Sequence, residues 1–246
     1  MNILCVISAR GGSKGLKGKN VRPMLGMPLI AWSIEQAKAC PEINRVAVST
    51  DSEEIASVAR QHGAEVPFMR PAELSDDKAG KWQVWQHALD TYEKQSGWPV
   101  DLYVDLDCTS PLRDVSDISR AIAQFRSSDV DAVISVCEAR KNPYFNLLEY
   151  EDGALRMSKK LPRPIVRRQD APAVFEHVAS IYVVSPRYLR SGTGLLSGKV
   201  VGYDIGREKS LDVDNDFDFE LIEYLMKRRG KASHERVLSR QAQDRS

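Results

Sequence analysis

Short apolar runs alternate with longer stretches of helical character through the first 137 residues of this chain of 246 residues. Each run is apolar almost throughout, rather than at every second position, which is typical of strands that are covered on both faces. We expect strands at residues 3–8, 45–50, 101–107 and 131–136, and helices at residues 28–40, 51–63, 79–95 and 114–128. Strands and helices that alternate in this way predict an α/β fold with a mostly parallel sheet and helices on both of its faces.

This alternation stops between residues 138 and 175, where prolines and mixed charge interrupt the pattern. We expect irregular structure or short antiparallel strands there, not disorder, because the aromatic and leucine side chains of residues 144–148 need burial. The pattern resumes with expected strands at residues 177–185 and 199–206 and a final helix at residues 216–230 that ends at Gly230. The predicted organisation is an α/β domain of residues 1–137 and 176–230, an insertion of residues 138–175, and a basic flexible tail of residues 231–246.

The overall charge argues against two classes of partner. Lysine and arginine number 35 against 34 acidic residues, for a formal net charge of +1. A nucleic-acid or membrane-surface binder normally carries a basic excess, so we expect neither partner and interpret the basic residues after Lys227 as a solvated end. No stretch approaches the roughly 20 apolar residues of a membrane span, and the apolar run before Arg10 is too short for a signal peptide. The four cysteines, which form no CxxC pair, are expected to be buried thiols of a reduced, cytoplasmic protein.

The segment ARGGSKGLKGKN, residues 9–20, follows the first expected strand and combines glycines with basic side chains. It is not a P-loop, because Ser13 stands where the first glycine is required and Asn20 follows Lys19. It is not a dinucleotide fingerprint either, because G-x-G-x-x-G has no match in it. Its glycines let backbone N–H groups turn toward an anion, and its basic side chains suit the phosphates of a nucleoside triphosphate. A turn that uses glycine and lysine only for geometry and solvation is the alternative.

Four further polar stretches are expected at the same edge of the sheet, at residues 49–51, 70–80, 105–113 and 210–220. In an extended segment, the side chains of Asp212 and Asp214 point to one face. Two carboxylates on one face suit Mg²⁺, which takes phosphate oxygens and waters as further ligands. The alternative is that these acids solvate a strand end and cap the next helix. We prefer that alternative for Asp216 and Asp218, and it stays open for Asp212 and Asp214.

The loop ARGGSKGLKGKN, the segments RPAELS, TSPLR and RRQDAP, and the late DVDNDFDF occur in one order along residues 2–225. Together they resemble the acylneuraminate cytidylyltransferases, or CMP-sialic acid synthetases. The resemblance implies a Rossmann-like α/β domain, Mg²⁺ as cofactor, and a homodimer formed through the insertion. It also implies transfer of CMP from CTP to the anomeric hydroxyl of a nonulosonic acid, with release of pyrophosphate.

The resemblance also implies a role for each matching residue. Arg10, Lys19 and Asp214 would be catalytic, and Asp212 and Asp214 would hold the metal, which would polarise the α-phosphate. The nucleotide site would consist of Arg10, Gly11, Gly12, Ser13, Lys14, Gly15, Asn20, Arg70, Asp107, Thr109, Ser110 and Arg113. The sugar site would include Arg167, Arg168 and Gln169, because a planar guanidinium suits a sugar carboxylate.

Two departures from the pattern of sialic acid enzymes point toward a subgroup. Asp107 stands where glutamine is expected, as a second metal contact or a changed contact to base or sugar, and FEHVASIYVV replaces an expected NGAIYI type. Both are closer to members that act on bacterial sialic-acid-like sugars such as legionaminic acid. The alternatives are a cytidylyltransferase for 3-deoxy-manno-octulosonate or another 2-keto sugar acid, and a nucleotide-binding dimer without catalysis.

Overall fold

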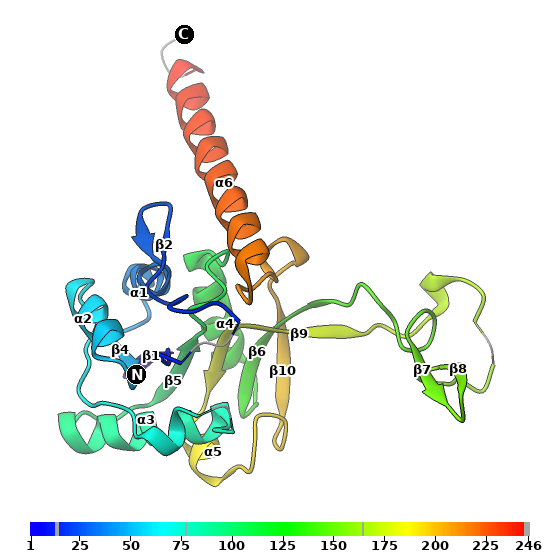
Figure 1. Ribbon diagram of the computed structural model, residues 1–246, viewed down its shortest axis with the longest axis horizontal. Helices are drawn as coiled ribbons and strands as arrows, with labels where there is room; N and C mark the ends of the chain where they lie inside the picture. The colour runs from blue at the N-terminus through cyan, green and yellow to red at the C-terminus, as the bar shows by residue number, and fades with distance from the viewer. Residues whose placement is uncertain (13–14, 77, 164, 244–246) are drawn as a thin grey trace.

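The computed structural model describes residues 1–12, 15–76, 78–163 and 165–243. Its centre is a six-stranded sheet in the order β10-β6-β9-β5-β1-β4 (Figure 1). The strands are β1 Ile3–Ser8, β4 Arg45–Ser49, β5 Leu102–Leu106, β6 Ala132–Glu138, β9 Phe175–Val184 and β10 Val200–Asp204. All of these strands run in one direction except β9, which pairs antiparallel with both β5 and β6. The expected mostly parallel sheet is therefore confirmed, with one reversed strand inside it.

The antiparallel pairing of β6 with the reversed strand β9 is irregular at one point. The pairing of β6 with β9 shifts register between Ile134 and Val136. Ser135, which lies in the shift, is fully buried; its hydroxyl donates to the carbonyls of Val178 (2.7 Å) and Ile181 (3.1 Å). The same hydroxyl accepts from the N–H of Ile181 at 2.8 Å. One side chain thus satisfies the backbone groups that the shift leaves without a ladder partner.

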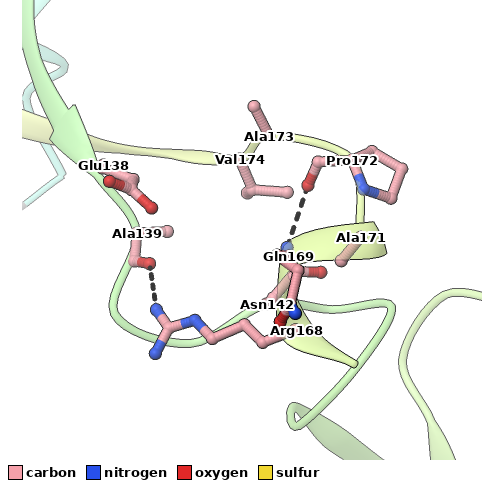
Figure 2. A pocket seen from close by; sticks show the side chains of 9 residues that line it. All are labelled: Glu138, Ala139, Asn142, Arg168, Gln169, Ala171, Pro172, Ala173 and Val174. Carbon is pink, nitrogen blue, oxygen red and sulfur yellow. Dashed lines mark hydrogen bonds between the residues drawn. The ribbon is translucent and has the colours of Figure 1, made fainter. Parts of the chain in front are cut away.

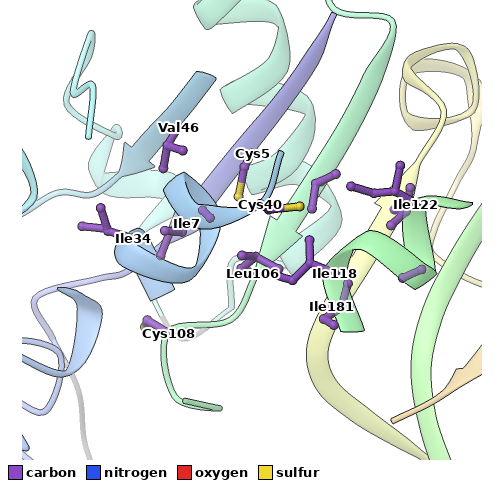
Figure 3. Close-up of a cluster of buried hydrophobic side chains, with 14 of the residues drawn as sticks. Cys5, Ile7, Ile34, Cys40, Val46, Leu106, Cys108, Ile118, Ile122 and Ile181 are labelled. Carbon is purple, nitrogen blue, oxygen red and sulfur yellow. The ribbon is translucent and has the colours of Figure 1, made fainter. Parts of the chain in front are cut away.

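Helices cover both faces of the sheet, and alternate residues of β1 separate the two cores. Ile3, Cys5 and Ile7 belong to the core beneath α1 Leu29–Ala39, α2 Glu53–Gln61 and α4 Val115–Ser127 (Figure 3). Leu4 and Val6 face the opposite core, beneath α3 Lys81–Ser96 and α5 Pro186–Ser191. Because both faces are buried, both sets of positions are apolar, which explains the continuous apolar run in the sequence.

Helix α2 lies within the range expected for it, whereas the last helix runs past its expected end. Ser52 caps α2 by accepting from the N–H of Ile55 at 3.4 Å, and Gly63 ends the turn after it with φ of 81°. By contrast, α6 Asp216–Gln243 continues through Gly230, so the predicted end of the helix there is wrong. Gly230 is not among the glycines with positive φ. A glycine in helical conformation costs only about 1 kcal/mol, which weakens a helix without ending it.

The insertion between β6 and β9 forms an arm, residues 139–174, that projects from the body (Figure 1). It carries the antiparallel hairpin of β7 Leu148–Glu151 and β8 Ala154–Met157, as expected, and the short helix η2 Arg168–Asp170. The expectation that its leucines are buried is wrong within one chain, where Leu147 and Leu148 are 43% and 51% exposed. The arm has too few layers of structure to cover its own apolar side chains.

The remaining elements are short. They are β2 Pro23–Met24, β3 Met27–Pro28, η1 Ala72–Leu74 and η3 Arg207–Lys209. The four cysteines are free and buried, as expected. None of the helices in the described part of the chain is long and apolar enough to cross a membrane.

Candidate functional site

The opening loop, residues 9–20, lies against the acidic segment, residues 212–214, although the two are far apart in the sequence. The Lys19 ammonium donates to the carbonyl of Val213 at 2.7 Å and lies 3.7 Å from the carboxylate of Asp214. Gly15 packs directly on the Asp214 carbonyl, where a Cβ would collide with the backbone. The two motifs that the sequence placed at one edge of the sheet are therefore in contact.

Hydrogen bonds to buried or neighbouring side chains also hold the opening loop in place. Asn20 is only 5% exposed; its amide donates to the carbonyl of Arg10 at 3.0 Å and accepts from the thiol of Cys108 at 3.2 Å. The N–H of Gly11 donates to the Asp51 carboxylate at 2.8 Å. The side chain of Asn20, which the resemblance assigns to the nucleotide site, braces the opening loop through its two contacts. The expected nucleotide ligands Ser13 and Lys14 lie outside the described residues. Gly12 is exposed, and among the described residues no atom lies within 4 Å of the position that a Cβ would take there.

A cavity of about 250 Å³, the edge cavity, opens beside this loop at the carboxyl ends of β1 and β5. In a sheet of this kind, ligands bind beyond the carboxyl ends of the strands. Three basic side chains line it together with two carboxylates and several apolar groups. Its lining consists of Ser8, Arg10, Arg70, Leu74, Asp76, Ala79, Lys81, Val84 and Asp107.

Arg70 lines the edge cavity and has a largely buried guanidinium. Its side chain is 5% exposed, its Nε donates to the Ser75 hydroxyl at 3.2 Å, and its Nη2 lies 3.9 Å from the Asp51 carboxylate. Within the described residues, no group accepts a hydrogen bond from Nη2. Burial lowers the pKa of Arg70, which indicates how little water solvates it. A buried donor of this kind is suited to a polar or anionic ligand.

Asp107 stands where the resemblance predicts glutamine, and both of its carboxylate oxygens accept hydrogen bonds. Its Oδ2 accepts from the Lys81 ammonium at 2.7 Å, and its Oδ1 accepts from the hydroxyl and N–H of Thr109 at 3.0 and 3.3 Å. Burial opposes the ionised form of Asp107, but Lys81 outweighs it and holds the pKa below the usual range. The carboxylate is thus committed to a lysine, which leaves it poorly suited to a second metal.

Lys81 is a residue that the sequence reasoning missed. Besides Asp107, it lies 3.2 Å from the fully buried carboxylate of Asp105 and 4.3 Å from the centre of the Tyr182 ring. Burial opposes its charge, yet Asp105 and Asp107 hold its pKa well above the usual range. The sequence does show two aspartates, Asp105 and Asp107, that alternate at the end of an expected strand. It does not show that Lys81, near the start of the helix expected from residue 79, lies beside them.

The TSPLR turn, residues 109–113, packs beneath the edge cavity and donates hydrogen bonds to backbone carbonyls of the protein. The Ser110 hydroxyl donates to the carbonyl of Ala179 at 2.7 Å, and the Arg113 guanidinium donates to the carbonyls of Ser180 and Asp107 at 3.0 and 2.7 Å. Ser110 and Arg113 are 0% and 2% exposed. Both were expected to line the nucleotide pocket. They lie beneath its surface instead, because their donors are used by carbonyls of the protein; Thr109, at 9%, is nearer the surface.

The acidic segment holds an excess of negative charge. The side chain of Asp214 is 74% exposed, and the pKa of the half-buried Asp212 is raised by burial and then by Asp214 and Asp107. No group of three or more His, Cys, Asp or Glu side chains is arranged to hold a metal in the described ranges. Two carboxylates near one another nevertheless fit Mg²⁺, which usually takes one or two from the protein and completes its shell with phosphate and water.

Asp216 and Asp218 were both predicted to cap the last helix, and the structure shows this for Asp218 alone. The Asp218 carboxylate accepts from the N–H groups of Asp214 and Asn215 at 3.2 and 3.3 Å, while the Asn215 side chain accepts from the N–H of Asp218 at 3.0 Å. This reciprocal pair caps α6. Asp216 instead pairs with Arg22, which ties the helix to the end of the opening loop.

The residues expected at the sugar site lie in the arm, around a second cavity of about 360 Å³ at its root (Figure 2). Arg168 and Gln169 line this arm cavity, and Arg168 donates to the carbonyls of Ala139 and Arg140 at 3.3 and 3.0 Å. Arg167 pairs with Asp170 through two contacts of 2.9 and 3.1 Å. The arm projects away from the opening loop (Figure 1), so one chain does not bring these residues to the edge cavity.

A mostly parallel sheet with a basic glycine-rich loop and an acidic pair at one edge defines an α/β protein of the nucleotide-binding type. A comparison with protein families is more specific. The model of the cytidylyltransferase family matches residues 4–182, and the chain belongs to that family. It is therefore an enzyme of the nucleotidyltransferase class.

Curated relatives agree with this assignment. The chain is 41% identical to post-translational flagellin modification protein B of Campylobacter coli, over 92% of this chain and 95% of the relative. It is 38% identical to CMP-N,N'-diacetyllegionaminic acid synthase of Campylobacter jejuni, over 91% and 94%. It is 31% identical to N-acylneuraminate cytidylyltransferase of Escherichia coli, over 89% of this chain but 51% of the relative. The resemblance drawn from the motifs is confirmed.

A solved structure supports the fold. The structure of CMP:2-keto-3-deoxy-manno-octonic acid synthetase complexed with CTP superposes with a TM-score of 0.71, covering 93% of this chain and 100% of the other. The two sequences are only 16% identical, so this likeness shows the shared Rossmann-like nucleotidyltransferase architecture and nothing finer.

Proposed function

We propose that this enzyme transfers CMP from CTP to the anomeric hydroxyl of a nonulosonic acid and releases pyrophosphate, with Mg²⁺ as cofactor. The observation that carries the proposal is the contact between the opening loop and the acidic segment through Lys19, Val213 and Asp214. This contact supports the proposal because the loop proposed to bind the triphosphate and the two proposed metal ligands lie beside one another. A site that only bound a nucleotide would have less need of the acids.

In this reaction the anomeric oxygen forms a bond to the α-phosphorus, the bond from that phosphorus to the bridging oxygen breaks to release pyrophosphate, and the hydroxyl proton passes to solvent water. Charge grows on the departing pyrophosphate, so cations fixed beside it lower the barrier more than they tighten ground-state binding. Arg10, on the opening loop, lines the edge cavity, and Lys19 is held in place by Val213. Mg²⁺ on Asp212 and Asp214 would supply Lewis-acid polarisation of the α-phosphate.

The proposed acceptor is a sialic-acid-like sugar of the legionaminic type. The support is the pair of sequence departures together with the relative of 38% identity, whose name specifies diacetyllegionaminic acid. The relative at 31% identity is named for N-acylneuraminate, so N-acetylneuraminic acid is the second candidate. A 3-deoxy-manno-octulosonate enzyme is the remaining catalytic alternative.

We further propose that the enzyme acts as a cytoplasmic homodimer joined through the arm. Large apolar side chains of the arm and its junction with the sheet are exposed in the single chain: Leu148, Tyr150, Leu155, Val166 and Phe175. Large apolar side chains that stay exposed in one chain favour an interface, and Tyr150 and Leu155 are cross-strand partners in the hairpin. In a dimer, Arg167, Arg168 and Gln169 could reach the neighbouring subunit's sugar site, which they do not reach in their own chain. The mass of the particle by light scattering, for wild type and Tyr150→Asp, tests the dimer.

The reaction is tested by pyrophosphate release from CTP and Mg²⁺ with N-acetylneuraminate, di-N-acetyllegionaminate and 3-deoxy-manno-octulosonate, one at a time. We expect release with a nonulosonate, and most with the legionaminate. Omission of Mg²⁺ and the variant Asp214→Asn are the matched negative controls. Tight binding of CTP without release from any acceptor would favour the non-catalytic nucleotide-binding dimer.

A further inference from the structure

We propose that Lys209 is a positioning residue, whose ammonium fastens the acidic segment to the first turn of α4 and so holds Asp212 and Asp214 where the metal is needed. The inference rests on the proposed function, because it takes those two acids as the metal ligands. Lys209 is the last residue of η3 and precedes Asp212 by three positions. It touches the reaction only through the chain that follows it.

The anchor for Lys209 is a buried carboxylate that has further partners of its own. The Lys209 ammonium donates to Oδ2 of Asp117 and lies beside the carboxylate of Asp114, at 2.7 Å in each case. The side chain of Asp117 is 2% exposed; its Oδ1 accepts from the Tyr203 hydroxyl at 3.0 Å, and its Oδ2 also accepts from the N–H of Asp114 at 2.8 Å. Burial opposes the charge of Lys209, but the two carboxylates outweigh it and hold its pKa above the usual range. The position of this ammonium is therefore fixed by α4 and β10 together.

The acidic segment is thereby attached at two points to one stretch of the protein, residues 109–117. Upstream of the segment, Lys209 is bound by the two acids of α4 and its cap. Within the segment, the N–H of Val213 donates to the carbonyl of Thr109 at 2.9 Å. Asp212 lies between these two attachments. Because both attachments belong to the buried TSPLR turn and the helix that follows it, the acids are referred to one rigid base.

Lys209 acts on the acids through the backbone and not through its charge. The pKa of Asp212 is raised by burial and then by Asp214 and Asp107, and the cation that opposes this rise is Lys19. The charge of Lys209 is balanced by its own two carboxylates. Like charges in the acidic segment repel one another, so a segment without its anchor would spread before a metal arrived. Metal binding would then have to restore the order, which weakens the affinity.

The first test measures the acidic segment in the protein without metal or nucleotide. Hydrogen exchange of the peptide of residues 210–216, followed by mass spectrometry, would compare wild type with Lys209→Met, which keeps the length of the side chain but has no donor. We expect exchange at the Val213 N–H to be at least about tenfold faster in Lys209→Met. Lys209→Arg, which can bind both carboxylates, should stay within about threefold of wild type. The matched control is Lys199→Met, which removes an exposed lysine paired with Asp129 and should leave this exchange unchanged.

The second test uses the metal dependence of pyrophosphate release. In Lys209→Met, the Mg²⁺ concentration that gives half the maximal rate should rise about tenfold, and kcat/KM should fall about 10- to 100-fold. Lys209→Arg should recover most of both losses. Lys199→Met should match wild type.

A second substitution separates positioning from stability. Loss of Lys209 leaves the carboxylate of Asp117 buried without its cation, which by itself destabilises the protein. Asp117→Asn, added to Lys209→Met, removes that charge, so the melting temperature should rise again by at least about 3 °C. Exchange and Mg²⁺ dependence should not recover, because the attachment is still missing. If Lys209→Met does not fold, the double variant takes its place in both comparisons.

Wild-type exchange at residues 210–216 in a folded variant without Lys209 would overturn the inference. Faster exchange with an unchanged Mg²⁺ dependence would also overturn it, as would recovery of the Mg²⁺ dependence in the double variant, which indicates a role in stability alone. If the wild type releases no pyrophosphate with any acceptor, the proposed reaction fails, and the exchange measurement still decides whether Lys209 positions the acidic segment.

Discussion

The contact between Gly15 and the acidic segment allows a sharp test, the substitution Gly15→Ala. A Cβ on residue 15 would lie closer than 3.0 Å to the carbonyl oxygen of Asp214, a separation that real Cβ atoms essentially never show. The obstacle is backbone, so no side chain can rotate away to relieve it. Restoring an ordinary contact of 3.4 Å requires the opening loop and the acidic segment to separate by about 1 Å.

That separation should reduce catalysis much more than stability. Catalytic groups must be held within roughly 0.5 Å, and a displacement of about 1 Å can cost about a hundredfold in rate. We therefore expect kcat/KM for pyrophosphate release to fall about 10- to 100-fold, or about 1.4–2.7 kcal/mol. Because Gly15 is exposed, the melting temperature should change by less than about 3 °C.

The matched control is Gly194→Ala. Gly194 lies in the loop after α5, has no positive φ, and has nothing within 4 Å of an added Cβ. It should keep wild-type activity and stability. If Gly15→Ala keeps kcat/KM within threefold of wild type while Gly194→Ala does the same, close packing of the loop on the acidic segment has no part in catalysis and the reasoning is wrong.

Three further predictions follow from the same structure. Asp214→Asn should abolish pyrophosphate release. Its melting temperature should stay within about 2 °C of wild type, because the side chain of Asp214 is 74% exposed. Full activity of this variant would show that Asp214 does not hold the metal. Lys19→Ala should lose about 2–4 kcal/mol of transition-state stabilisation, measured as kcat/KM, and a loss below tenfold would make the opening loop a scaffold. Burial, and then Arg70, lower the pKa of His87 from 6.5, so the unfolded chain binds its proton more readily. The free energy of unfolding from urea titrations should therefore fall as the pH is lowered from about 7.5 to about 5.5, and fall less in His87→Gln; an equal fall in both would exclude His87 as the cause.

Most of the sheet and its helices could be predicted because their signals are local. A strand buried on both faces is apolar at every position, as β1 is, and a helix start such as that of α2 carries its capping serine in the sequence. The reversal of β9 could not be predicted, because strand direction depends on the path of the arm and not on β9's own residues. The extension of α6 was missed because glycine ends a helix only when the chain turns to positive φ, which composition does not show.

The proximity of the two motifs could be predicted from the sequence, but the contacts of single side chains could not. The opening loop and the acidic segment were placed at the same edge, and Lys19 connects them. The directions of Asn20 and Arg113 could not be foreseen, since a polar residue in a loop can face a ligand or the protein, and both face the protein. Lys81 was missed because its partners Asp105 and Asp107 lie on another element, and only the folded chain brings the three together.

The reversed strand also affects the order in which the enzyme is built on the ribosome. β5 and β6 have no direct pairing in the sheet; β9 lies between them and is synthesised after both. Until it arrives, the carbonyl of Ser180, which accepts from the N–H of Asp107 and from Arg113, is missing from the floor of the site. The nascent chain meanwhile exposes two strand edges, which are the usual starting points of aggregation. The candidate site is therefore completed late, and a chain that stalls within the arm has neither the full sheet nor the carbonyl of Ser180 beneath the site.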